Sequence, residues 1–188
     1  TGIYTSGNDF TLKAEAGSFS RNAFSSNRKS LFTEFRKKKY PHFNYYAELI
    51  NSESNDSLSG YWLRQNGEFK GELGWFRPFV KYRGENRKSS LHDSLNSGFR
   101  FHEWQGGVFI ENKGIECNIS RTFRDDDKYQ DYTLQQYSYS STDRIGLGFR
   151  FSRGFSSDIM YTHHNRTYED PAVEDNITDL ADVKMNFS

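Results

Sequence analysis

The sequence predicts an all-β protein, an antiparallel up-and-down meander of about eleven or twelve strands that forms a β-barrel or a barrel-like curved sheet. Apolar and polar residues alternate with a period of two along most of the 188 residues, as in strands with one apolar face. Aromatic residues make up 17% of the chain, although its mean hydropathy is −0.91. Disordered chains lack aromatic residues, so this combination favours a sheet that is apolar on one side only.

The clearest alternation lies in residues 144–164, RIGLGFRFSRGFSSDIMYTHH, where a Ser-Arg-Gly turn separates two predicted strands. Small or charged residues stand between the apolar ones, so one side of this hairpin is aromatic and the other is polar. We expect the aromatic side to face either lipid or a protein core. Its residues are Ile145, Leu147, Phe149, Phe151, Ile159 and Tyr161.

The same alternation divides the whole chain into segments. They cover residues 9–20, 30–37, 42–51, 58–65, 68–83, 98–111, 114–124, 132–139, 144–153, 155–166 and 180–188. Asn66-Gly67 predicts a tight hairpin turn, because both residues tolerate positive φ. Asn112-Lys113-Gly114 predicts a second short turn.

Longer polar connections are expected near residues 20–29, 84–97, 124–131 and 167–179. Tight and long turns then alternate approximately, which is typical of strands that run up and down through an outer membrane. The segment Gln105-Gly106-Gly107 is compatible with a turn between two strands or with a bulge inside one strand. A bulge would bring Val108 onto the same face as Phe99.

The side of the predicted sheet opposite to the aromatic one carries charge repeatedly. We expect this side to line a wet interior or to face solvent, and its charged residues include Lys70, Glu72, Arg100 and Arg150. Three charges fall on the aromatic side instead: Arg64, Glu103 and Arg121. A charge at the middle of a bilayer costs about 2 to 4 kcal/mol, so these three weigh against contact with lipid unless they lie at strand ends or past bulges.

The composition and motifs argue against several classes of function. The 25 basic and 25 acidic residues give a net charge of zero, which argues against a nucleic-acid partner. No nucleophile, phosphate-binding or cofactor motif is present, so we expect neither an enzyme nor a cofactor. The single cysteine, Cys117, is expected to lie on the face of Ile115 and Ile119 as a small apolar residue.

No metal site is predicted. The adjacent His163 and His164 point to opposite faces of a strand and cannot readily bind the same ion. The residues Asp125–Asp127 form a predicted acidic turn, and the segment 169–179 is also acidic. Both are expected to be solvated, with Ca²⁺ binding as an alternative.

Residues from about 58 to 188 contain three longer stretches, GYWLRQNGEFKGELGWFRPFVKYRGENR, IGLGFRFSRGFSSDIMYTHHNRTYED and NITDLADVKMNFS. These stretches resemble segments of very large exported β-rich proteins of Bacteroidota-like bacteria. The resemblance implies an outer-membrane or cell-surface location and a chain that is a fragment of a longer protein. It assigns no functional residue.

The sequence thus predicts a single β-meander domain over residues 1–188, exported to the outer membrane or cell surface. Its expected role is that of a β-barrel or scaffold that is structural or forms a passage, without catalysis. The expected partners are outer-membrane lipid and other parts of a larger surface assembly. The alternative is a soluble extracellular β-domain that binds glycan or protein through exposed aromatic residues.

Overall fold

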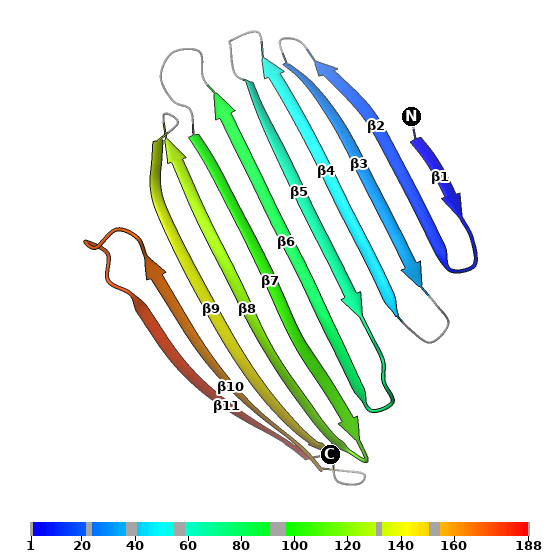
Figure 1. The fold of residues 1–188 in the computed structure, drawn as a ribbon, viewed down its shortest axis with the longest axis vertical. Helices are drawn as coiled ribbons and strands as arrows, with labels where there is room; N and C mark the ends of the chain where they lie inside the picture. The colour runs from blue at the N-terminus through cyan, green and yellow to red at the C-terminus, as the bar shows by residue number, and fades with distance from the viewer. Residues whose placement is uncertain are drawn as a thin grey trace.

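The computed structural model describes residues 2–21, 24–36, 41–54, 59–90, 97–130, 133–150 and 155–187. Within these residues, eleven strands and no helix form one antiparallel sheet in which each strand pairs with its neighbours in sequence (Figure 1). The strands are β1 (Gly2–Ser6), β2 (Phe10–Arg21), β3 (Phe24–Arg36), β4 (His42–Ser54), β5 (Ser59–Lys70), β6 (Phe76–Ser90), β7 (Ser97–Asn112), β8 (Ile115–Gln130), β9 (Thr133–Arg150), β10 (Phe155–Tyr168) and β11 (Asn176–Phe187). The predicted all-β meander is confirmed.

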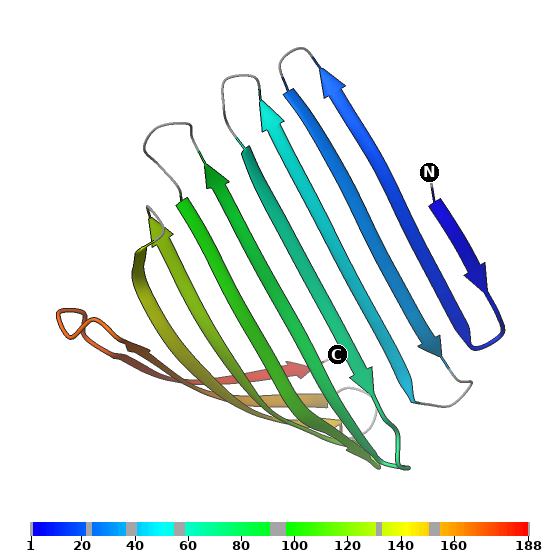
Figure 2. The ribbon, with the colours of Figure 1, turned by 45° about the horizontal axis from the view of Figure 1, so that its top comes forward.

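The sheet is open, with β1 and β11 as its two edges. It is also curved, because β9, β10 and β11 turn out of the plane of the first strands (Figure 2). We call the end of the sheet where β10 ends and β11 begins the upper end. The opposite end, which includes residues 71–75 and the turn at Lys113-Gly114, is the lower end (Figure 1).

The predicted hairpin at Asn66-Gly67 is wrong, because β5 continues through both residues to Lys70. Gly67 pairs with Tyr45 on one side and with Tyr82 on the other. These two cross-strand tyrosines flank the position that lacks a side chain, and pairing on both sides satisfies the backbone. The chain turns instead at residues 71–75, where Gly74 has a φ of +66°.

The predicted bulge or turn at Gln105–Gly107 is also wrong. The ladder of β7 with β6 and β8 runs through these residues without a shift of register. Val108 therefore lies on the face opposite to Phe99. The predicted turn at Asn112-Lys113-Gly114 is confirmed, and Lys113 and Gly114 both have positive φ, at 46° and 83°.

Three of the predicted long connections belong largely to strands, and residues 84–90 of the one predicted at 84–97 lie in β6. Only residues 22–23 separate β2 from β3, so the predicted connection at residues 20–29 is mostly strand. The segment Asp125–Asp127 is not an acidic turn, because it lies inside β8 and pairs with β7 and β9. The strands are therefore longer than the alternation of apolar residues indicated, and they extend into polar sequence.

The two adjacent glycines of β7 allow a test of this register. A Cβ atom on Gly107 would lie 2.5 Å from the carbonyl oxygen of Ile119 and 2.7 Å from the Phe79 ring, whereas Gly106 has no atom within 4 Å of that position. We expect Gly107→Ala to lower the free energy of unfolding by about 1 to 3 kcal/mol. Gly106→Ala should change it by less than about 0.5 kcal/mol.

Urea unfolding followed by far-ultraviolet circular dichroism measures both variants. Equal effects of the two substitutions would contradict the continuous ladder, because only that ladder places the two glycines on opposite faces.

Candidate functional site

Every side chain of the sheet belongs to one of two faces, which the register defines. Residues directly opposite each other in an antiparallel pair point to the same side. Leu147 pairs with Cys117 and Ile159, and these pair in turn with Ile110 and Val183. We call the side of Leu147 the apolar face and the other side the polar face.

Rows of apolar side chains cross the apolar face from strand to strand, and we call these rows together the apolar band. One row contains Phe10, Phe35, Phe43, Phe69 and Val80 on β2 to β6. A second contains Pro78, Val108, Ile119, Ile145, Tyr161 and Ala181 on β6 to β11. The third contains Phe76, Ile110, Cys117, Leu147, Ile159 and Val183. The prediction that Cys117 shares a face with Ile115 and Ile119 is confirmed.

The apolar band has no covering layer in the part of the chain that the structure describes. Phe101, on the polar face, is the buried apolar side chain of these residues. Ile119, Ile145 and Val183 are exposed. Soluble monomers rarely expose a continuous apolar surface over several strands, so the apolar band has the character of a contact surface.

The apolar band crosses the strands obliquely. Its upper edge lies at Leu49 on β4, and the row of Leu49 reaches β9 at Tyr137. On β9, however, the apolar band begins eight residues later, at Ile145. Between β4 and β9 the upper edge of the apolar band thus moves by eight residues, about 26 Å along the strands, over five strand spacings, about 24 Å across them. The strands therefore tilt by roughly 45° relative to the normal of the apolar band.

A row of charged residues follows the upper edge of the apolar band on β8 to β11. Arg121 forms an ion pair with Asp143 at 2.7 Å, and in the same row His163 lies 2.8 Å from Asp179. Arg121 is thus on the apolar face, as predicted. Arg64 and Glu103 lie on the polar face instead, because their strand partners Glu48 and Arg124 point to that side.

The register brings most of the predicted aromatic side together. Ile145, Leu147 and Phe149 share the apolar face with Ile159 and Tyr161 across the β9–β10 pair. Phe151, which belongs to the same prediction, lies outside the described residues.

The four predicted polar-side residues are divided. Lys70 and Arg150 lie on the polar face. Glu72 lies in the turn of residues 71–75, 3.7 Å from Arg77. Arg100 is on the side of the apolar face, above the apolar band, where it forms an ion pair with Asp127. Its side differs from the predicted one because β7 lacks the bulge.

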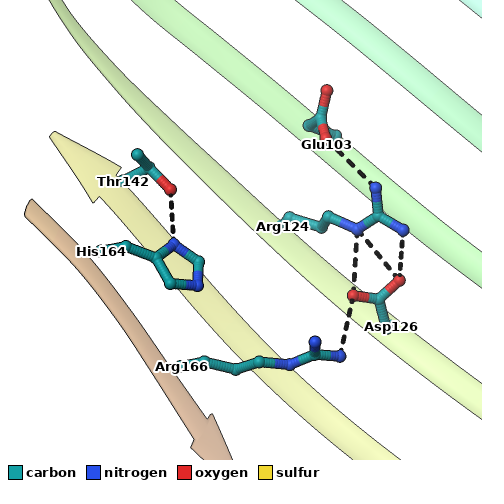
Figure 3. Close-up of polar contacts among 6 residues, drawn as sticks. All are labelled: Glu103, Arg124, Asp126, Thr142, His164 and Arg166. Atoms are coloured by element: carbon teal, nitrogen blue, oxygen red, sulfur yellow. Dashed lines mark hydrogen bonds and ion pairs between the residues drawn. The ribbon is translucent and has the colours of Figure 1, made fainter. Parts of the chain in front are cut away.

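The polar face carries a network of ion pairs across β7 to β10 (Figure 3). Arg124 contacts Asp126 at 2.7 Å and Glu103 at 3.4 Å. Arg166 reaches across β9, where it donates a hydrogen bond to Ser138 at 2.9 Å and lies 3.7 Å from Asp126. Side chains of β8 and β10 meet across β9 because Ser138, which lies between them, is small.

Two further observations concern the chemistry of the site. His164 contacts Thr142 on the polar face, so the prediction that His163 and His164 point to opposite faces is confirmed (Figure 3). Among the described residues, no three His, Cys, Asp or Glu side chains are placed to hold a metal ion. No helix there has the length and apolar composition needed to cross a bilayer.

Sequence reasoning did not find the polar network. The sequence does not show how β8, β9 and β10 align, so it gives no reason to place Arg166 near Arg124 and Asp126. In the structure Asp126 on β8 pairs with Ser138 on β9. Only this alignment shows that Arg166 on β10 can reach Asp126.

The burial of Asp126 leads to a stability prediction. Asp126 is only 8% exposed, so it depends on its cations. We expect Arg124→Gln to lower the free energy of unfolding by about 1 to 3 kcal/mol, because it removes the main partner of a buried carboxylate. The matched variant Arg150→Gln breaks an ion pair with Glu116 in which the arginine is exposed, and should cost less than about 1 kcal/mol.

Urea titration of both variants gives the comparison. Equal losses would show that Asp126 does not depend on Arg124.

The fold is similar to that of a known receptor. No protein-family model matches the sequence, and no curated protein matches it either. A solved structure, that of BauA, the ferric preacinetobactin receptor from Acinetobacter baumannii, aligns with a TM-score of 0.51 at 10% sequence identity. The alignment covers 97% of this chain and 41% of the receptor chain. This chain therefore has the strand arrangement of a part of that receptor.

Proposed function

We propose that this chain forms part of the wall of an outer-membrane β-barrel, with the apolar band against lipid and the polar face toward a water-filled interior. Its role is structural or passage-forming and involves no catalysis. The observation that carries the proposal is the apolar band itself, which crosses the sheet continuously and has no covering layer in the described residues. An outward apolar band and a polar interior are the defining surfaces of such barrels.

The tilt of the strands supports the same proposal. Strands of outer-membrane barrels tilt by about 35 to 45° from the barrel axis. The oblique course of the apolar band requires a tilt close to this range if the apolar band lies parallel to a membrane plane. Aromatic side chains also stand at its upper edge, where Tyr82 packs on Trp104 at 4.5 Å between ring centroids. Aromatic residues at this level are typical of membrane–water interfaces.

The position of the apolar band along the strands favours one orientation. On β9 the apolar band occupies only Ile145 to Phe149, near the lower end, while more than ten residues of the strand extend above it. Outer-membrane barrels have short turns on the periplasmic side and longer extensions outside the cell. We therefore propose that the lower end faces the periplasm and the upper end faces the exterior.

A matched pair of adjacent residues on β10 tests the contact with lipid. Ile159 on the apolar face is 41% exposed, and Met160 on the polar face is 50% exposed. Each is changed to Cys in a Cys117→Ala background and labelled with a fluorophore in lipid vesicles. We expect lipid-borne quenchers to act on position 159 and aqueous iodide to act on position 160, because the two side chains point to opposite sides of the wall.

Aqueous quenching of both positions, or a protein that stays in solution beside the vesicles, would overturn the proposal. That result would favour a soluble β-domain that binds glycan or protein.

Two exposed loop residues test the orientation. Val173→Cys places a thiol at the upper end and Leu73→Cys places one in the lower turn, again with Cys117→Ala. A membrane-impermeant maleimide should label position 173 in intact cells and position 73 only after the outer membrane is permeabilised. The reverse pattern would show that the orientation is wrong.

A further inference from the structure

One row of the polar face, near the upper end, alternates cations with aromatic rings. Trp62 on β5 pairs with Arg87 on β6, which pairs with Phe99 on β7, which pairs with Lys128 on β8. No carboxylate interrupts this row over the four strands. Arg87 lies five residues above Tyr82, the upper end of the apolar band on β6, so the row lies above the level assigned to lipid.

Guanidinium groups lie over Trp62 and over Phe101, which belongs to the next row of the same face. Arg64 lies 4.2 Å and Arg87 lies 6.0 Å from the centroid of the Trp62 ring. Arg83 lies 5.4 Å from the centroid of the Phe101 ring. All three arginines are exposed, and none of them forms an ion pair within the described residues.

The nearest carboxylates already have partners among the described residues. Glu48 forms an ion pair with Arg28 at 2.5 Å, and Glu103 is turned toward Arg124. Glu85 accepts a hydrogen bond from the indole nitrogen of Trp62 at 2.8 Å. The exposed cations of this region therefore exceed its uncommitted acids, whereas Arg28, Arg124 and Arg150 elsewhere on the polar face form ion pairs.

We propose that Arg64 and Arg87, with Arg83 and Lys128 flanking them on the same face, form a binding site for a small polyanionic solute with two or more carboxylate or phosphate groups. Stacking on an aromatic ring holds a guanidinium by its face and leaves its N–H edge free. That edge matches carboxylate and phosphate oxygens in a bidentate geometry. Because Arg64 and Arg87 share one indole, a single solute with two anionic groups can contact both.

Trp62 provides the signal for a binding experiment. With Trp75→Phe and Trp104→Phe, Trp62 is the remaining tryptophan of the chain. Its ring lies beneath Arg64 and Arg87, the two central arginines of the proposed site. We expect inorganic pyrophosphate to change its fluorescence saturably in detergent solution. The double variant Arg64→Gln, Arg87→Gln should raise the dissociation constant at least tenfold, while Arg150→Gln on the same face should leave it unchanged.

A second variant tests the charge balance in the opposite direction. Glu85→Gln removes the carboxylate nearest to the arginines but keeps an oxygen that accepts the indole hydrogen bond. We expect it to tighten pyrophosphate binding several-fold, an effect that misfolding cannot produce.

The absence of a saturable change, or equal affinities in all variants, would overturn the site. The measurement needs no membrane, so its failure is distinct from failure of the vesicle quenching test.

Discussion

The structure depends on one constraint, the strict alternation of side chains in a sheet that has a single layer. Because β1 to β11 pair in order, each side chain can point to only one side of the sheet. The row from Phe76 to Val183 therefore contains one side chain from each of six strands. In a sandwich, a second sheet would cover that row. Here the described residues supply no cover, so the apolar side depends on its surroundings and the backbone ladder holds the sheet together.

The polar side carries the buried apolar side chain Phe101 together with a network of ion pairs. Phe101 is buried between the guanidinium groups of Arg83 and Arg124, and the ion pair of Arg124 with Glu103 links β8 to β7. Asp126 links β8 with β10 through Arg166. Such links act across a neighbouring strand, in the part of the sheet that bends in Figure 2.

The sequence was sufficient for the class of fold and for the side of most apolar residues, because period-two alternation is a local property. It was insufficient wherever pairing overrides local preference. Asn66-Gly67 has the composition of a turn, yet both neighbouring strands pair with it. Asp125–Asp127 looks like a loop, but Arg100 and Arg124 compensate two of its three charges inside β8. The polar network combines three strands, and its residues could be placed together only once the register was known.

The directions of the two edge strands limit how the open sheet can close into a ring. In an up-and-down meander all odd-numbered strands run the same way, so β1 and β11 are parallel to each other. Joining these two edges directly would create a parallel seam in an otherwise antiparallel ring. A second copy in the same orientation would create the same seam, since its β1 would meet β11. A ring that is antiparallel throughout therefore contains an odd number of additional strands between the two edges, and its total is even.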